Sequence, residues 1–151
     1  MKFNLKKFII ILLSTFIIGN LFSFLSFDTS FYKSLEKSID VPGIIFPIVW
    51  SILFLLMSIS LYMATNNKED NTYSYIIYYV QLIINSLWTL FFFGFKLYLF
   101  SFFWIILIII SVITMIINFY KKNKVSSLLQ IPYLVWLIFA SYLNFMIYYL
   151  N

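Results

Sequence analysis

The stretch VPGIIFPIVWSILFLLM (residues 41–57) decides the fold, because beyond its opening proline and glycine it is apolar and uncharged. A helix needs roughly 20 apolar residues, each rising ~1.5 Å, to cross the hydrocarbon core of a bilayer. This stretch belongs to a set of uncharged runs that are each long enough to cross once: 8–27, 41–67, 71–95, 97–120 and 125–151. The sequence therefore predicts five membrane crossings.

We expect an all-α membrane protein in which residues 1–151 form a single domain, a bundle of five transmembrane helices. The chain is 64% hydrophobic and only 10% charged, which is more apolar surface than a soluble core of this size can bury. Barrel strands would alternate polar and apolar residues, and FFWIILIIISVI (102–113) does not. The expected helices have these approximate bounds: 8–27, 43–66, 72–95, 98–119 and 126–149.

Lysine placement predicts how the chain crosses the cell membrane. Cytoplasmic ends carry the excess of basic residues, and lysines beside lipid headgroups also explain the net charge of +5 without a nucleic-acid partner. The N-terminus is expected to be cytoplasmic, the C-terminus outside, and the first helix retained, since no small-residue cleavage site follows it. Seven lysines fall on the predicted inner side and three on the outer: Lys2, Lys6, Lys7, Lys68, Lys121, Lys122 and Lys124 against Lys33, Lys37 and Lys96.

The composition also limits the kinds of catalytic and metal-binding site that the chain can form. The chain has no cysteine and no histidine, which removes thiol chemistry, imidazole bases and the commonest ligands of zinc, copper and haem iron. Its five acidic residues all lie in predicted loops. We therefore expect no metal site and no cofactor, and the residues favour a binding protein over an enzyme.

Polar and small residues recur at helical spacing and predict which faces point into the bundle. Packing between helices alone would explain any one of these stripes, but the amides of Gln81 and Asn85 bring more hydrogen-bonding groups than packing requires. We predict inward faces at these positions: Thr15, Gly19 and Ser23; Gln81, Asn85 and Thr89; Ser111, Thr114 and Asn118; Trp136, Ala140 and Asn144.

The tryptophans predict a cavity in the outer half of the membrane. Trp104 has the position of an interfacial anchor, whereas Trp50 and Trp136 lie too deep for one. Phe46, Trp50 and Phe54 share a helix face, and Trp88, Thr89 and Ala140 come to similar depths, with Asn85 at the floor. An aromatic cavity with few hydrogen-bonding groups suits a planar, conjugated molecule that arrives from lipid.

The prolines at the start of the second helix have two interpretations. Pro42 suits a first helical turn, and Pro47 is expected to remove a backbone hydrogen bond and kink the helix. Pro42 and Gly43 then either only mark the start of the helix or form part of a lid. A lid is possible because the loop SFDTSFYKSLEKSIDVPG (26–43) lies on the same side as the predicted cavity.

Three motifs resemble the TspO/MBR family, the bacterial relatives of the mitochondrial translocator protein, also called the peripheral-type benzodiazepine receptor. VPGIIFPIVWSILFLLM (41–57) is similar to the second helix of that family, QLIINSLWTLFFF (81–93) to its third, and IPYLVWLIFASYLNFMIYYLN (131–151) to its fifth. The motifs occur in the family's order and cover essentially the whole chain.

This resemblance implies a five-helix bundle, often a homodimer, that binds porphyrins such as protoporphyrin IX. Some members degrade protoporphyrin in a light- and oxygen-dependent way that relies on the tryptophans matching Trp50 and Trp136, which would then be catalytic. The family's ligand-binding residues carry over onto Tyr32, Phe46, Trp50, Phe54, Asn85, Trp88, Thr89, Trp136 and Ala140.

The sequence departs from the family pattern at several places. Ile39 and Val41 stand where the family has a tryptophan and a proline, and Phe54 replaces a tyrosine. The lack of histidine favours a metal-free porphyrin, and the C-terminus lacks the basic residue of a sterol motif. Three hypotheses remain: a tetrapyrrole-binding protein that senses, transports or chaperones porphyrins, a porphyrin-degrading enzyme, and a structural or carrier subunit of a membrane complex.

Overall fold

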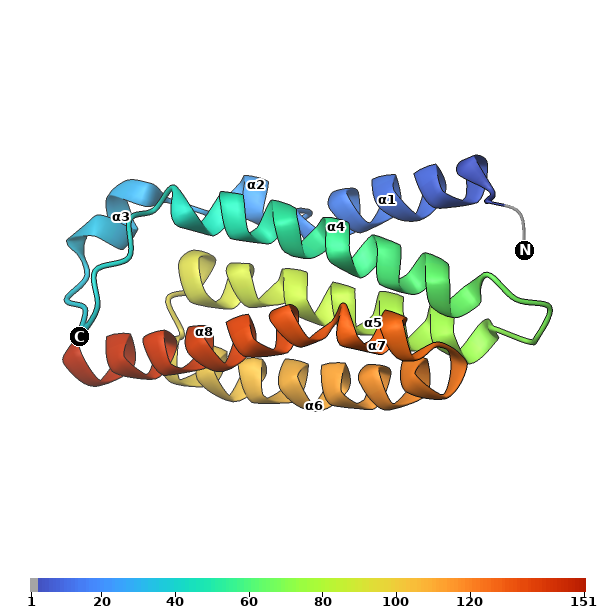
Figure 1. Ribbon diagram of the computed structural model, residues 1–151. Coiled ribbons are helices and arrows are strands. Elements are labelled where there is room, and N and C mark those ends of the chain that lie inside the picture. The colour runs from blue at the N-terminus through green and yellow to red at the C-terminus, as the bar shows by residue number, and fades with distance from the viewer. Residues whose placement is uncertain (1–2) are drawn as a thin grey trace.

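The computed structural model describes residues 3–151, which form an all-helical bundle (Figure 1). Five stretches of this part of the chain are long and apolar enough to cross a membrane: Leu5–Ser26, Ile45–Thr65, Thr72–Gly94, Tyr98–Lys122 and Lys124–Leu150. The expected all-α class and the five crossings are confirmed. Lys2, which contributed to the predicted orientation, lies outside the described residues.

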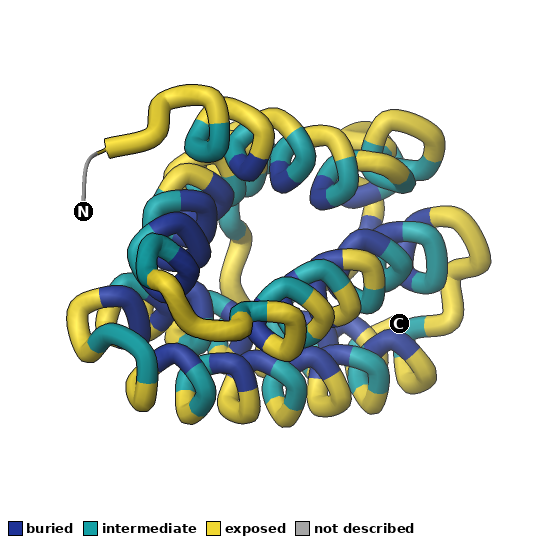
Figure 2. The backbone as a smooth tube through the Cα atoms, turned by 90° about the vertical axis from the view of Figure 1, so that its right-hand side faces the viewer, coloured by how far each residue is buried: buried dark blue, intermediate teal, exposed yellow. Residues whose placement is uncertain are grey.

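The long helices run side by side, and the described part of the chain begins at one end of the bundle and finishes at the other (Figure 1). Each long helix turns its buried residues inwards and its exposed, mostly apolar residues outwards (Figure 2), the pattern that a lipid environment requires. The principal helices are α1 (Leu5–Gly19), α4 (Ile45–Thr65), α5 (Thr72–Thr89), α6 (Tyr98–Lys122) and α8 (Ile131–Leu150).

The first and last crossings are each interrupted, which differs from the continuous helices expected there. After α1 the chain turns over residues 20–22 and continues as the short helix α2 (Ser23–Ser26). The Asn20 side chain donates a hydrogen bond to the carbonyl of Phe16, 2.9 Å away, and such local bonding by asparagine competes with helix continuation. In the last crossing, α7 (Lys124–Leu128) precedes α8.

The third crossing ends in a π-helical segment, η1 (Leu90–Gly94), which is continuous with α5. Wider turns of this kind recur at functional sites because they change the direction in which side chains point. Phe92 and Phe93 are both buried within η1, and Trp88 stacks on Phe92 with ring centroids 5.1 Å apart. The segment therefore supplies two aromatic rings on the inner side of the bundle.

The expected kink at Pro47 is wrong. Helix α4 begins at Ile45, so Pro47 lies in its first turn. The first backbone N–H groups of a helix have no partner within it, so a proline there removes no hydrogen bond.

The expected inward face of α6 is wrong at Ser111 and Thr114, whereas Asn118 does face the bundle, where it accepts a hydrogen bond from the Ser74 hydroxyl of α5 at 2.7 Å. Thr114 is exposed, and the hydroxyls of Ser111 and Thr114 bond to carbonyls of their own helix. The buried face consists instead of apolar residues, among them Ile108, Val112 and Met115, each with no exposed surface. Serine and threonine can satisfy their hydroxyls in this way while they face lipid.

Candidate functional site

A cavity of about 250 Å³ lies between α1, α2, α4, α5, η1 and α8, and Tyr32 also lines it. Nine of its nineteen lining residues are aromatic, and none of the described residues that line it carries a charge. The lining residues are Gly19, Asn20, Ser23, Phe24, Phe27, Tyr32, Phe46, Pro47, Trp50, Phe54, Asn85, Trp88, Thr89, Phe92, Phe93, Ala140, Leu143, Asn144 and Ile147.

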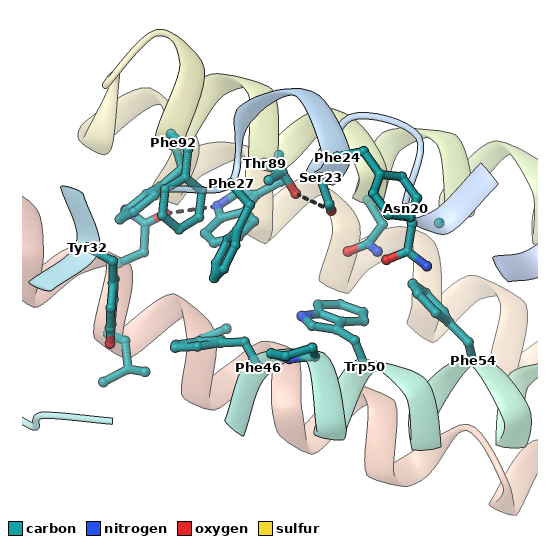
Figure 3. A pocket seen from close by; sticks show the side chains of 18 of the residues that line it. Asn20, Ser23, Phe24, Phe27, Tyr32, Phe46, Trp50, Phe54, Thr89 and Phe92 are labelled. Carbon is teal, nitrogen blue, oxygen red and sulfur yellow. Dashed lines mark hydrogen bonds between the residues drawn. The ribbon is translucent and has the colours of Figure 1, made fainter. Parts of the chain in front are cut away.

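Helix α4 forms one wall of the cavity from aromatic residues spaced four apart. Phe46, Trp50 and Phe54 project from it towards the side chains on the opposite side (Figure 3). The rings of Trp50 and Phe54 are 5.4 Å apart, and Phe46 lies 6.0 Å from Trp136. The wall therefore offers adjacent ring faces on which a flat molecule can stack.

The four tryptophans fall into two pairs according to whether their indole N–H groups form hydrogen bonds within the described residues. Trp88 donates to Asn144 Oδ1 at 3.0 Å, and Trp104 donates to the carbonyl of Ile84 at 2.8 Å. Trp104 thus ties α6 to α5, and its assignment as an interfacial anchor stays a prediction. Within residues 3–151, no acceptor lies within hydrogen-bond distance of the indole nitrogens of Trp50 and Trp136.

The opposite side of the cavity carries its few polar groups. Asn85 is 6% exposed, and no described residue forms a hydrogen bond with its side-chain amide. Ser23 and Thr89 approach each other at 3.5 Å, and Asn20 points into the cavity beside them (Figure 3). A guest would meet two amides and two hydroxyls here, which can bind polar atoms at the edge of a flat ring.

Gly19 lets the end of the cavity next to α1 close tightly. A Cβ atom at this position would lie 2.6 Å from Cε1 of Phe54, well inside van der Waals contact. The absence of a side chain at Gly19 therefore allows the Phe54 ring to pack directly against α1, where Phe16 meets the same ring at 5.5 Å.

The other end of the cavity is covered by the loop that contains α3 (Thr29–Ser34). Tyr32 of α3 is buried, and its ring lies 5.3 Å from that of Phe46. Burial, reinforced by the nearby negative charge of Asp40, raises the pKa of the Tyr32 phenol, so it remains neutral at physiological pH. The loop is also tied to the last residue, because Asn151 exchanges hydrogen bonds with the backbone N–H and carbonyl of Glu36.

Eight of the nine residues proposed to bind a ligand line this cavity. The ninth, Trp136, lines an adjoining space of about 20 Å³ whose walls include Trp50, Asn85 and Ala140. Pro42 and Gly43 do not line either space. Pro42 instead accepts a hydrogen bond from the Ile45 N–H at the start of α4.

Several lining residues were not singled out from the sequence as part of the site. The signal for Asn20 was an amide one residue after Gly19 of the small-residue stripe, and the signal for Phe92 and Phe93 was the FFF run (91–93) in η1. Asn144 was assigned to an inward face, but its neighbour Leu143 gave no signal. In the part of the chain that the structure describes, no three potential metal-ligating residues come together.

Comparison of the sequence with known proteins identifies relatives over most of its length. The family model described as TspO/MBR matches residues 8–150. The tryptophan-rich protein TspO of Archaeoglobus fulgidus is 36% identical over 98% of this chain and 99% of its own length. The protein of the same name from Chlorobaculum tepidum is 36% identical over 80% of this chain and 79% of its own length. Protein CrtK of Rhodobacter capsulatus is 32% identical over 81% of this chain and 79% of its own length.

Proposed function

Because the chain belongs to the TspO/MBR family, we propose that it is an integral membrane protein that binds planar tetrapyrroles of the protoporphyrin type in the cavity between α4 and α5. Binding is the step that sensing, transport and chaperoning of porphyrins would share. The observation that carries the proposal is an uncharged, largely apolar cavity in which the Asn85 amide and the Trp50 indole N–H form no hydrogen bond with any described residue.

The chemistry of the lining supports a flat, conjugated guest. Ring-to-ring contacts contribute about 0.5 to 1.5 kcal/mol each beyond the area they bury, and Trp50 and Phe46 offer such contacts. A guest from lipid is already out of water, so these contacts and a few hydrogen bonds must provide selectivity. The Trp50 N–H can donate to an acceptor on the guest, and the Asn85 amide can both donate and accept.

Titration of the purified protein with protoporphyrin IX tests the proposal through tryptophan fluorescence. Wild-type protein should show saturable quenching. Trp50→Phe and Trp136→Phe each keep a ring but lose the indole N–H and part of the stacking surface, so the affinity should fall by about fivefold, equivalent to about 1 kcal/mol.

Trp104→Phe provides the matched control, because this tryptophan bonds to Ile84 and lines neither space. Its affinity for protoporphyrin should stay within about twofold of wild type. Absence of saturable quenching, or an equal effect of all three substitutions, would remove the cavity as a tetrapyrrole site.

We also propose that the N-terminal end of the bundle faces the cytoplasm and that the cavity opens towards the outer side. Most described lysines belong to the end of the bundle where α1 begins and where α4 connects to α5, and fewer belong to the end that holds α3 and the last residues of α8; Figure 1 shows these two ends. This distribution agrees with the excess of basic residues on cytoplasmic ends. We further propose that residues 1–151 form a single domain and that the protein assembles as a homodimer.

The natural lack of cysteine makes the orientation directly testable. Ser38 and Lys68 are exposed in the loops at opposite ends of the bundle. A membrane-impermeant maleimide should label Ser38→Cys in intact cells and Lys68→Cys only after permeabilisation. The reverse pattern would place the cavity mouth in the cytoplasm.

A further inference from the structure

A second cavity, independent of the proposed tetrapyrrole site, lies at the N-terminal end of the bundle. It has a volume of about 300 Å³ and is open on one side, between the first turns of α1 and the start of α5. Lys6, Lys7 and Ile10 line it from α1, and Tyr75 and Tyr79 line it from α5. We propose that this groove binds the headgroup of an anionic glycerophospholipid.

The groove is built around the ammonium group of Lys7. Lys7 Nζ donates to the carbonyl of Thr65 at 2.6 Å and lies 5.7 Å and 6.0 Å from the ring centroids of Tyr62 and Tyr75. These contacts hold the charge at the wall of the groove. An ammonium has three donors, so a bound anion can use those that Thr65 does not occupy.

No carboxylate of the described residues forms an ion pair with Lys6 or Lys7. The carboxylates in the neighbouring loop are engaged elsewhere, because Glu69 bonds to Lys122 at 2.7 Å and Asp70 accepts from Thr72. Lys6 is exposed beside the groove. The two lysines therefore leave a local positive charge that the protein does not neutralise.

The tyrosines direct their hydroxyl protons away from an incoming anion. The Ser14 hydroxyl donates to Ile11, so Tyr79 is the donor in its 2.7 Å bond to Ser14. Tyr75 donates to Thr65 Oγ1 at 3.2 Å. The groove thus offers ammonium groups and aromatic ring surface, which suits a phosphate attached to an apolar body.

The position of the groove favours a lipid over a free ion. Lys6 and Lys7 begin the first membrane crossing, at the level where lipid phosphates lie, and Ile10, one turn further along, is 55% exposed on the face that lipid covers. The phosphate can therefore sit between the lysines while its acyl chains continue over apolar residues of α1. Each lysine near an anionic membrane surface strengthens attraction by an amount that corresponds to about fivefold in affinity.

Native mass spectrometry of the detergent-purified protein, with added phosphatidylglycerol or phosphatidylcholine, tests this site. Wild-type protein should retain one phosphatidylglycerol in preference to phosphatidylcholine. Lys6→Gln should weaken that binding several-fold, and Lys6→Gln with Lys7→Gln by about tenfold or more. The single variant keeps the test valid if loss of the Lys7 contact impairs folding.

Lys121→Gln with Lys124→Gln is the matched control, since it removes the same charge from the same end of the bundle but away from the groove. This control should retain wild-type lipid binding. An equal loss in both double variants, or equal retention of the two lipids by wild type, would overturn the site. Displacement of the lipid by millimolar inorganic phosphate would also overturn it, because the groove would then bind free phosphate.

Discussion

Ala140→Phe is expected to weaken protoporphyrin binding at least tenfold while the bundle stays folded. Ala140 lines both the main cavity and the smaller space beside Trp136, so a phenyl ring there would occupy the volume that a guest needs. Added bulk destabilises a packed core by about 1 to 3 kcal/mol. Here it enters existing space, so the melting temperature should change little. Fluorescence titration and thermal unfolding in detergent measure the two effects separately.

The control for this substitution places the same phenyl ring on the outside of the same helix. Val135 is 60% exposed and lines neither space. Val135→Phe should bind protoporphyrin with wild-type affinity and melt at the wild-type temperature. If Ala140→Phe also bound normally, the ligand would have to occupy another part of the molecule.

The five crossings were predictable because a single physical requirement dominates them. A helix in lipid must be long, apolar and uncharged, and each of these properties can be read directly from the sequence. The breaks after Gly19 and before Ile131 were not predicted, because each lies inside an uncharged run of the sequence, 8–27 or 125–151. They depend on local hydrogen bonding by Asn20 and on the turn before Pro132.

Part of the candidate site could be predicted from the spacing of residues along each helix. This spacing shows which residues share a face of the helix, but it does not show which other helices that face contacts. Gln81, Asn85 and Thr89 share one face of α5, and all are buried. Gln81 nevertheless lies outside the main cavity, where it accepts a hydrogen bond from the Tyr133 hydroxyl at 2.9 Å. The different roles of Gln81 and Asn85 depend on α8, and the sequence of α5 contains no information about that contact.

The tryptophans also show that the spacing of residues along a helix does not identify the hydrogen-bond partners of a side chain. Trp88 and Trp50 were both predicted to reach the cavity, and both line it. Only the structure distinguishes the indole of Trp88, which is bonded to Asn144, from that of Trp50, which has no acceptor among the described residues. A partner 56 positions away in the chain is fixed by the way the helices pack, and the local pattern of residues does not specify it.

Asn144→Leu is expected to cause the largest loss of stability among substitutions of similar size on α8. Asn144 is 2% exposed and connects three helices: it accepts from Trp88 and donates to the carbonyl of Tyr98 at 2.7 Å. Leucine removes both bonds and leaves the Trp88 N–H without its acceptor. Hydrogen bonds between membrane helices contribute about 0.6 kcal/mol on average and up to about 1.7. The two losses should therefore lower the melting temperature by about 3 to 10 °C.

Ser141→Ala separates this effect from a general sensitivity of α8. The Ser141 hydroxyl bonds only to the Ile138 carbonyl of its own helix, so its loss should change the stability by less than about 0.5 kcal/mol. A cycle with Trp88→Phe then isolates the pair, because the double variant should be less destabilised than the sum of the single variants by at least about 0.5 kcal/mol. Strict additivity would mean that the Trp88 indole and the Asn144 amide do not depend on each other. The contact between α5 and α8 at the cavity wall would then come from apolar packing alone.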